Sequence, residues 1–80
     1  MAMRSDLVDW IEAALRDNGG EATIVEVAKA IWSSHEDELR DSGDLFYTWQ
    51  YDMRWAALKL RKAGRLAEAA DGRRGLWALR

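Results

Sequence analysis

The chain has 80 residues, no cysteine and no proline, and its formal net charge is −2 at pH 7. A chain of this length forms one domain at most, and without cysteine it has neither disulfides nor a thiolate metal site. No apolar run approaches the roughly 20 residues that a membrane span requires, and no signal-peptide stretch opens the chain. We therefore expect residues 1–80 to form a single cytoplasmic domain with no membrane partner.

The first predicted helix begins after Ser5, which we expect to cap it, and ends at residues 18–20 (NGG). Asp6 would place a negative charge near the positive end of the helix dipole. Apolar residues recur at helical spacing and form one stripe: Leu7, Ile11, Ala14 and Leu15. The pattern predicts an amphipathic helix with one buried face.

A second helix is predicted to begin at Thr23, because Thr23 and Glu26 have the spacing of a capping box. The preceding residues 21–22 are too few to predict more than an extended connector. The helical pattern fades at residues 33–34, and the acidic segment 35–44 (HEDELRDSGD) fits either a solvated loop or a helical tail followed by a loop.

The third predicted helix covers about residues 48–63, with a start between Leu45 and Thr48 and with Thr48 as the best capping candidate. Five residues fall on one side of an ideal helical wheel and form its predicted core stripe: Trp49, Met53, Ala56, Leu60 and Ala63. The opposite side carries mostly polar residues: Gln50, Tyr51, Arg54, Leu58, Arg61 and Lys62.

The chain closes with a predicted β-hairpin over residues 66–79. Gly64 suits the left-handed position after a helix, and residues 71–72 (DG) form a strong tight-turn dipeptide between two short alternating runs. Three helices followed by a C-terminal β-hairpin predict an α+β fold of the winged helix-turn-helix type. In that fold the third helix enters the DNA major groove, and the hairpin, called the wing, lies along the phosphate backbone.

The charge is distributed unevenly along the chain. Residues 1–44 contain four Lys or Arg and eleven Asp or Glu, which gives a net charge of −7. Residues 45–80 contain eight Lys or Arg and three Asp or Glu, which gives a net charge of +5. Such asymmetry points to a surface that faces a polyanion. The alternative is that the two halves simply attract each other in the fold.

Three segments of the basic half resemble a known family: residues 54–56 (RWA), 60–66 (LRKAGRL) and 74–79 (RGLWAL). Together they are similar to the signature of the N-terminal winged-helix domains of Mrr-type restriction endonucleases. The resemblance covers about the last third of the chain and implies a winged helix that binds double-stranded DNA. The resemblance does not extend to a nuclease domain, so we do not expect restriction activity.

We expect seven residues to contact DNA: Gln50, Tyr51, Arg54, Arg61, Lys62, Arg73 and Arg74. Arg and Gln side chains match guanine and adenine edges in the major groove, and arginines at a wing tip suit phosphate. The alternatives are a solvated helix face and a charged tip that only protects the hairpin from pairing elsewhere.

A second possible function is that of a winged-helix protein-interaction module or adaptor. It would use the acidic first half and an apolar strip made of Tyr51, Trp55 and Leu58, which Tyr47 extends. The strip could also be covered by the wing and by residues 35–44, or could form a homodimer surface. We expect no enzymatic activity, cofactor or metal, since His35 stands alone in its acidic segment and nothing resembles a nucleophile elbow or a phosphate-cradling loop.

Overall fold

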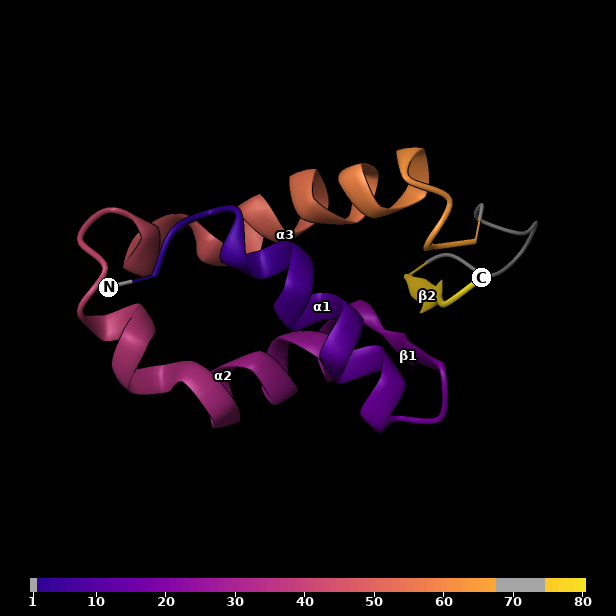
Figure 1. Cartoon of the computed structure of the whole chain (residues 1–80). Coiled ribbons are helices and arrows are strands. Elements are labelled where there is room, and N and C mark those ends of the chain that lie inside the picture. Colours follow the sequence, from indigo (N-terminus) through magenta and orange to yellow (C-terminus); the bar gives the residue numbers. More distant parts are fainter. Residues whose placement is uncertain (1, 68–74) are drawn as a thin grey trace.

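The computed structural model describes residues 2–67 and 75–80. Its elements follow the order α1 (Asp6–Asp17), β1 (Glu21–Thr23), α2 (Ile24–Arg40), α3 (Leu45–Lys62) and β2 (Leu76–Ala78). The three helices pack together, and the two strands lie at one end of the molecule beside the C-terminus (Figure 1). This α+β arrangement is that of a winged helix and confirms the predicted fold class. No helix within the described ranges is long and apolar enough to cross a membrane.

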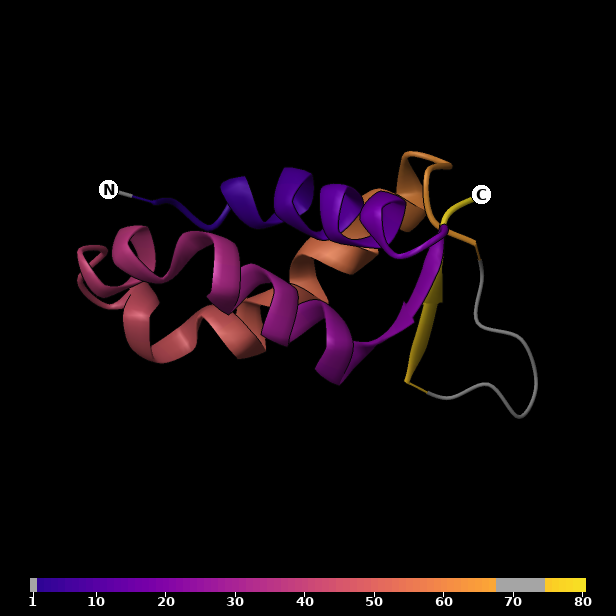
Figure 2. The same ribbon diagram turned by 90° about the horizontal axis from the view of Figure 1, so that it is seen from below.

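The small sheet joins the middle of the chain to its end. β1 and β2 pair antiparallel, with Ala22 opposite Trp77, and the two strands run side by side in Figure 2. The expectation that residues 21–22 form only a connector is therefore wrong. A strand of three residues is too short for its alternation to be recognised, and the pairing partner that makes it a strand lies more than 50 residues away.

The base of the wing is a hairpin, as predicted. Leu66 bridges Leu79, the Ala67 amide donates to the Ala78 carbonyl (2.8 Å), and the Arg80 amide donates to the Arg65 carbonyl (3.2 Å). Leu66 and Trp77 are both buried, so the body of the wing belongs to the core. The predicted turn at residues 71–72 lies outside the described residues.

Helix α2 begins at the predicted capping box. The Glu26 amide donates to Thr23 Oγ1 (3.1 Å), and the Thr23 amide donates to Glu26 Oε1 (2.8 Å). The backbone hydrogen bond from Thr23 holds the pKa of the Glu26 carboxyl below its usual value, and the Thr23 hydroxyl acts in the same direction.

The other two predicted side-chain caps do not form, although α1 begins at Asp6 directly after Ser5, as predicted. Ser5 makes no side-chain capping bond at the start of α1, where the Asp6 carboxylate instead accepts a hydrogen bond from the Met3 amide (2.9 Å). Helix α3 begins three residues before Thr48, because residues 41–44 already turn the chain. Thr48 is therefore inside the helix and donates to Asp52 Oδ2 (2.8 Å).

Helix α2 runs six residues beyond the point where the sequence pattern fades, so the helical tail is the correct alternative for the acidic segment. The backbone bends at His35 (φ −132°, ψ 21°), whose ring stacks on Trp10 with centroids 3.8 Å apart. After the bend, Leu39 is fully buried. A single buried leucine among charged residues is enough to extend the helix but too little to show as periodicity.

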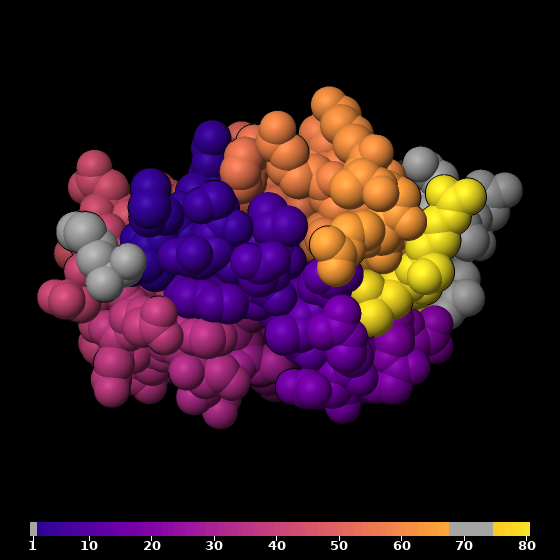
Figure 3. Space-filling view, in the orientation of Figure 1, coloured from indigo at the N-terminus to yellow at the C-terminus, as the bar shows by residue number. Residues whose placement is uncertain are grey.

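The core lies between the three helices and extends to the sheet. Leu7, Ile11 and Leu60 are almost fully buried, and α1 lies at the front of Figure 3 between α2 and α3. Four of the five residues in the predicted stripe of α3 are buried. The fifth, Ala63, is exposed because the helix ends at Lys62, and Ala57 takes part in the core instead.

Candidate nucleic-acid interface

One side of α3 faces solvent along its whole length, and we call it the exposed arc. Gln50, Arg54 and Lys62 are exposed on it, and Tyr51 is 77% exposed. Arg61 is only partly exposed, and its Nε lies 3.4 Å from the Ala67 carbonyl at the base of the wing. The structure therefore brings five of the seven predicted residues together on one helix.

The remaining two predicted residues, Arg73 and Arg74, lie outside the described residues. The strand that follows them is held at both ends by the segment around β1: the Leu79 amide donates to the Gly20 carbonyl (2.7 Å), and the Ile24 amide donates to the Gly75 carbonyl (2.7 Å). The contact between Arg61 and the Ala67 carbonyl places the base of the wing beside the C-terminal end of α3.

The exposed arc carries cations and no carboxylate. Asp52, the one acidic residue of α3, lies on the flank of the helix and accepts the hydrogen bond from Thr48. Neither Arg54 nor Lys62 forms an ion pair with any residue that the structure describes. Their charges are therefore available to a ligand.

A buried carboxylate connects α1 to the segment between α3 and the wing. Arg65 holds Glu12 through two contacts, Nη2 to Oε1 at 2.6 Å and Nε to Oε2 at 2.7 Å. The Glu12 side chain is only 12% exposed, and Arg16 approaches it at 3.8 Å from the same helix. Sequence reasoning missed this pair, because nothing local marks a glutamate whose partner lies 53 residues away.

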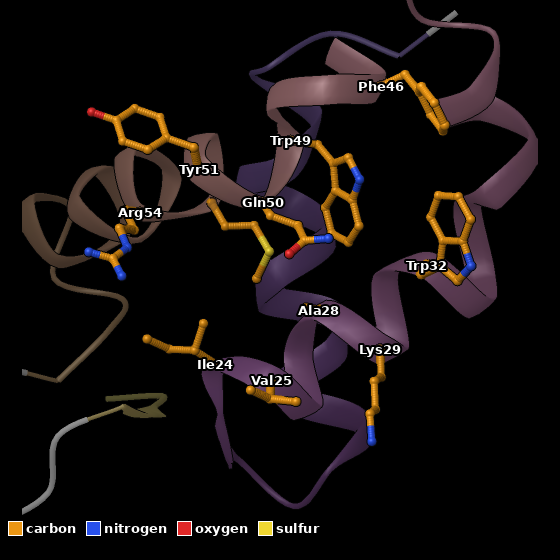
Figure 4. A pocket seen from close by; sticks show the side chains of 11 residues that line it. Ile24, Val25, Ala28, Lys29, Trp32, Phe46, Trp49, Gln50, Tyr51 and Arg54 are labelled. Carbon is orange, nitrogen blue, oxygen red and sulfur yellow. The ribbon is translucent and has the colours of Figure 1, made fainter.

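A groove of about 750 Å³ opens between α2 and α3 beside the exposed arc (Figure 4). Its lining combines apolar side chains with three polar ones and comprises Ile24, Val25, Ala28, Lys29, Trp32, Phe46, Trp49, Gln50, Tyr51, Met53 and Arg54. None of the α2 residues in this lining is among the predicted site residues.

Aromatic rings close one end of the groove, near the turn that joins α2 to α3. The Trp32 and Trp49 rings stack with centroids 6.0 Å apart and planes 9° apart, and Phe46 lies 6.3 Å from Trp32. The Arg40 guanidinium lies over the Trp32 ring at 5.1 Å and is paired with Glu36 at 2.8 Å. The other end is flanked by Ile24 and Arg54 (Figure 4).

The apolar strip predicted on α3 is divided in the structure. Tyr47 and Tyr51 are 83% and 77% exposed, so the alternative in which the strip is covered does not hold for these two residues. Trp55 is half-buried, with the Arg4 guanidinium 4.0 Å from its ring centroid and Lys59 Nζ at 5.5 Å. The segment before α1 thus partly covers Trp55, whereas Tyr47 and Tyr51 remain exposed to solvent.

The comparisons with known proteins give no relative. No family model, no curated protein and no solved structure matches the chain. Within residues 2–67 and 75–80, no group of three or more His, Cys, Asp or Glu side chains could hold a metal ion. We therefore infer function from the sequence and from the geometry of α3, the groove and the wing.

Proposed function

We propose that the chain is a DNA-binding winged-helix protein. In this proposal α3 lies in the major groove of double-stranded DNA, and the wing, residues 66–79, lies along the phosphate backbone. One observation carries it: in a chain of net charge −2, the exposed arc of α3 bears Arg54, Arg61 and Lys62 and no carboxylate. A duplex is the ligand whose charge and groove width suit such a helix.

The residue types suggest a division of roles. Arg54 and Gln50 are one helical turn apart and suit guanine and adenine edges. Lys62, near the helix end, suits a phosphate, and so do Arg73 and Arg74 of the wing. Arg61, which we also propose as a base contact, would need to leave the Ala67 carbonyl to reach a groove.

The resemblance of residues 54–79 to the N-terminal domains of Mrr-type endonucleases supports the same role and adds no catalytic one. We propose a cytoplasmic, non-enzymatic protein. One copy offers a single recognition helix, so sequence-specific binding would call for a two-fold dimer on paired half-sites.

A duplex titration across salt concentrations tests the proposal. With roughly two to four phosphates neutralised, the logarithm of the binding constant should fall with the logarithm of salt at a slope of about −2 to −4. Replacing Arg73 and Arg74 together by Ala should reduce that slope by roughly one to two and weaken all sequences alike. Absence of binding to any duplex at low salt would sink the proposal.

A second candidate function, a protein-interaction module, is favoured by the exposure of Tyr47, Tyr51 and Leu58 on the same arc. Large apolar side chains that cluster on a surface commonly mark a contact with another protein. In that case Tyr51→Ala would abolish partner capture, while the affinity for duplex would be absent in both the parent and the variant.

A further inference from the structure

The groove between α2 and α3 has a charge opposite to that of the chain as a whole. Its lining includes two charged side chains, Lys29 and Arg54, both cationic, and no Asp or Glu. Both are exposed, and neither forms an ion pair with a described residue. Since the chain carries a net charge of −2, this local excess of positive charge favours a negatively charged ligand.

The shape of the groove sets the kind of ligand. Its walls are residues 24–32 of α2 and 46–54 of α3, each spanning about 12 Å, or roughly two helical turns. Trp49 and Met53 are buried and form the floor, whereas Val25 and Tyr51 at the rim are 62% and 77% exposed. A drug-sized molecule is usually enclosed by its pocket, so open walls of this kind suit a segment of a larger chain.

We propose that this groove binds an acidic amphipathic helix of a partner protein. Apolar side chains at positions i, i+4 and i+7 of that helix contact the floor and the aromatic end, as in other helix-in-groove complexes. Its carboxylates face Lys29 on one wall and Arg54 on the other. A groove-to-groove contact with a second copy is disfavoured, because it would bring like charges together.

Peptide binding does not depend on the proposed duplex binding, although Gln50, Tyr51 and Arg54 belong to both surfaces. The experiment therefore contains no DNA, and its failure would leave the duplex proposal untouched. The probe is a capped peptide of about 16 residues with Leu at i, i+4 and i+7 and Glu at the flanking positions. Two matched peptides replace either every Glu by Lys or every Leu by Ala.

Binding to the full chain is measured by calorimetry and by the NMR signals of the tryptophan indole N–H groups. We expect one acidic peptide per chain, with shifts of the Trp32 and Trp49 signals and none of the Trp77 signal, since Trp77 is buried in the sheet. The Lys peptide and the Ala peptide should each bind at least about tenfold more weakly.

Charge reversal in the groove is the decisive variant. Lys29→Glu with Arg54→Glu should weaken the acidic peptide about five- to tenfold and strengthen the Lys peptide. The matched control, Lys59→Glu with Lys62→Glu, changes the net charge of the chain by the same amount, but both residues lie on α3 outside the groove. It should leave the preference for the acidic peptide over the Lys peptide unchanged. All four residues are exposed, so both variants should fold.

Equal binding of the acidic and Lys peptides, or equal effects of the two double variants, would overturn the proposal. So would no binding of the acidic peptide at low salt. Concentration-dependent shifts of the Trp32 and Trp49 signals without peptide would also overturn it, because they would identify a second copy as the occupant.

Discussion

The two flanks of α3 are built differently. Toward α1 the helix is closed: the contact is more extensive than that with α2, Leu60 and Ile11 are buried, and Arg4 covers Trp55. Toward α2 the groove opens along the N-terminal half of the helix, residues 46–54. Trp49 and Met53 belong both to the core and to the groove, so only the exposed residues of the open side are separate from the residues that hold the fold together. Substitutions of those exposed residues should leave the fold intact.

The largest effect is expected on the closed flank. Leu60 is 1% exposed, so Leu60→Ala should lower the free energy of unfolding by about 2 to 5 kcal/mol through lost burial and a cavity. Urea or thermal denaturation measures it. Leu58→Ala is the matched control, since Leu58 is 48% exposed two residues away and should cost far less. Equal losses would mean that the inner face of α3 is assigned wrongly.

On the open flank, Arg54→Ala should leave the melting temperature almost unchanged but weaken duplex binding by about 1 to 3 kcal/mol, by an amount that depends on the base sequence. Fluorescence anisotropy with a set of duplexes measures this loss. Arg16→Ala, an exposed arginine on α1, is the control and should bind like the parent. A uniform loss across sequences would make Arg54 a phosphate contact.

The ion pair between Glu12 and Arg65 connects the closed flank to the wing. Glu12→Gln should destabilise the fold by about 1 to 2 kcal/mol, because it removes the charge from two short hydrogen bonds to Arg65. Arg16→Ala should cost almost nothing, since Arg16 is 64% exposed and 3.8 Å from the carboxylate. Similar melting temperatures for Glu12→Gln and the parent would show that the pair does not stabilise the fold.

The start of α2 supports one wall of the groove through the capping box. Thr23→Ala should cost about 1 kcal/mol, whereas Thr48→Ala inside α3 should be close to neutral. Denaturation curves of the two variants distinguish a cap from an internal threonine. The reverse ranking would restore Thr48 as the cap of α3.

The smallest expected effect depends on pH. Because the pKa of Glu26 is lowered in the folded state, its stabilising contribution is fully present above its unfolded pKa of about 4.5 and is lost as the pH falls through the lower folded value. The melting temperature of the parent should therefore approach that of Glu26→Gln as the pH is lowered from about 6 to about 3. A constant difference across that range would show that Glu26 does not titrate with a lowered pKa.

Local patterns were enough to predict the helices, the capping box at Thr23 and the base of the wing. Each of these features depends on the spacing of residues that are close together in the chain, so a short stretch of sequence is enough to predict it. The core stripe of α3 was also predicted, except for Ala63, whose exposure depends on where the helix ends.

The features that the sequence did not reveal depend on distant partners. β1 becomes a strand only through β2, Glu12 is held by Arg65, and the groove exists only because α2 and α3 diverge. The two missing caps have different causes: Ser5 is in the N-cap position of α1 but makes no side-chain hydrogen bond, whereas α3 begins at Leu45 and leaves Thr48 inside the helix.

An NMR titration of the labelled full chain with a duplex at low salt tests the central claim most directly. We predict that the amide signals of residues 50, 51, 54, 61 and 62 shift together with those of the wing, while the acidic face of α1 around Asp9 is unaffected. The account would be contradicted if the chain were saturated with duplex and no signal from the exposed arc of α3 shifted. It would also be contradicted by shifts confined to α1 and the acidic end of α2.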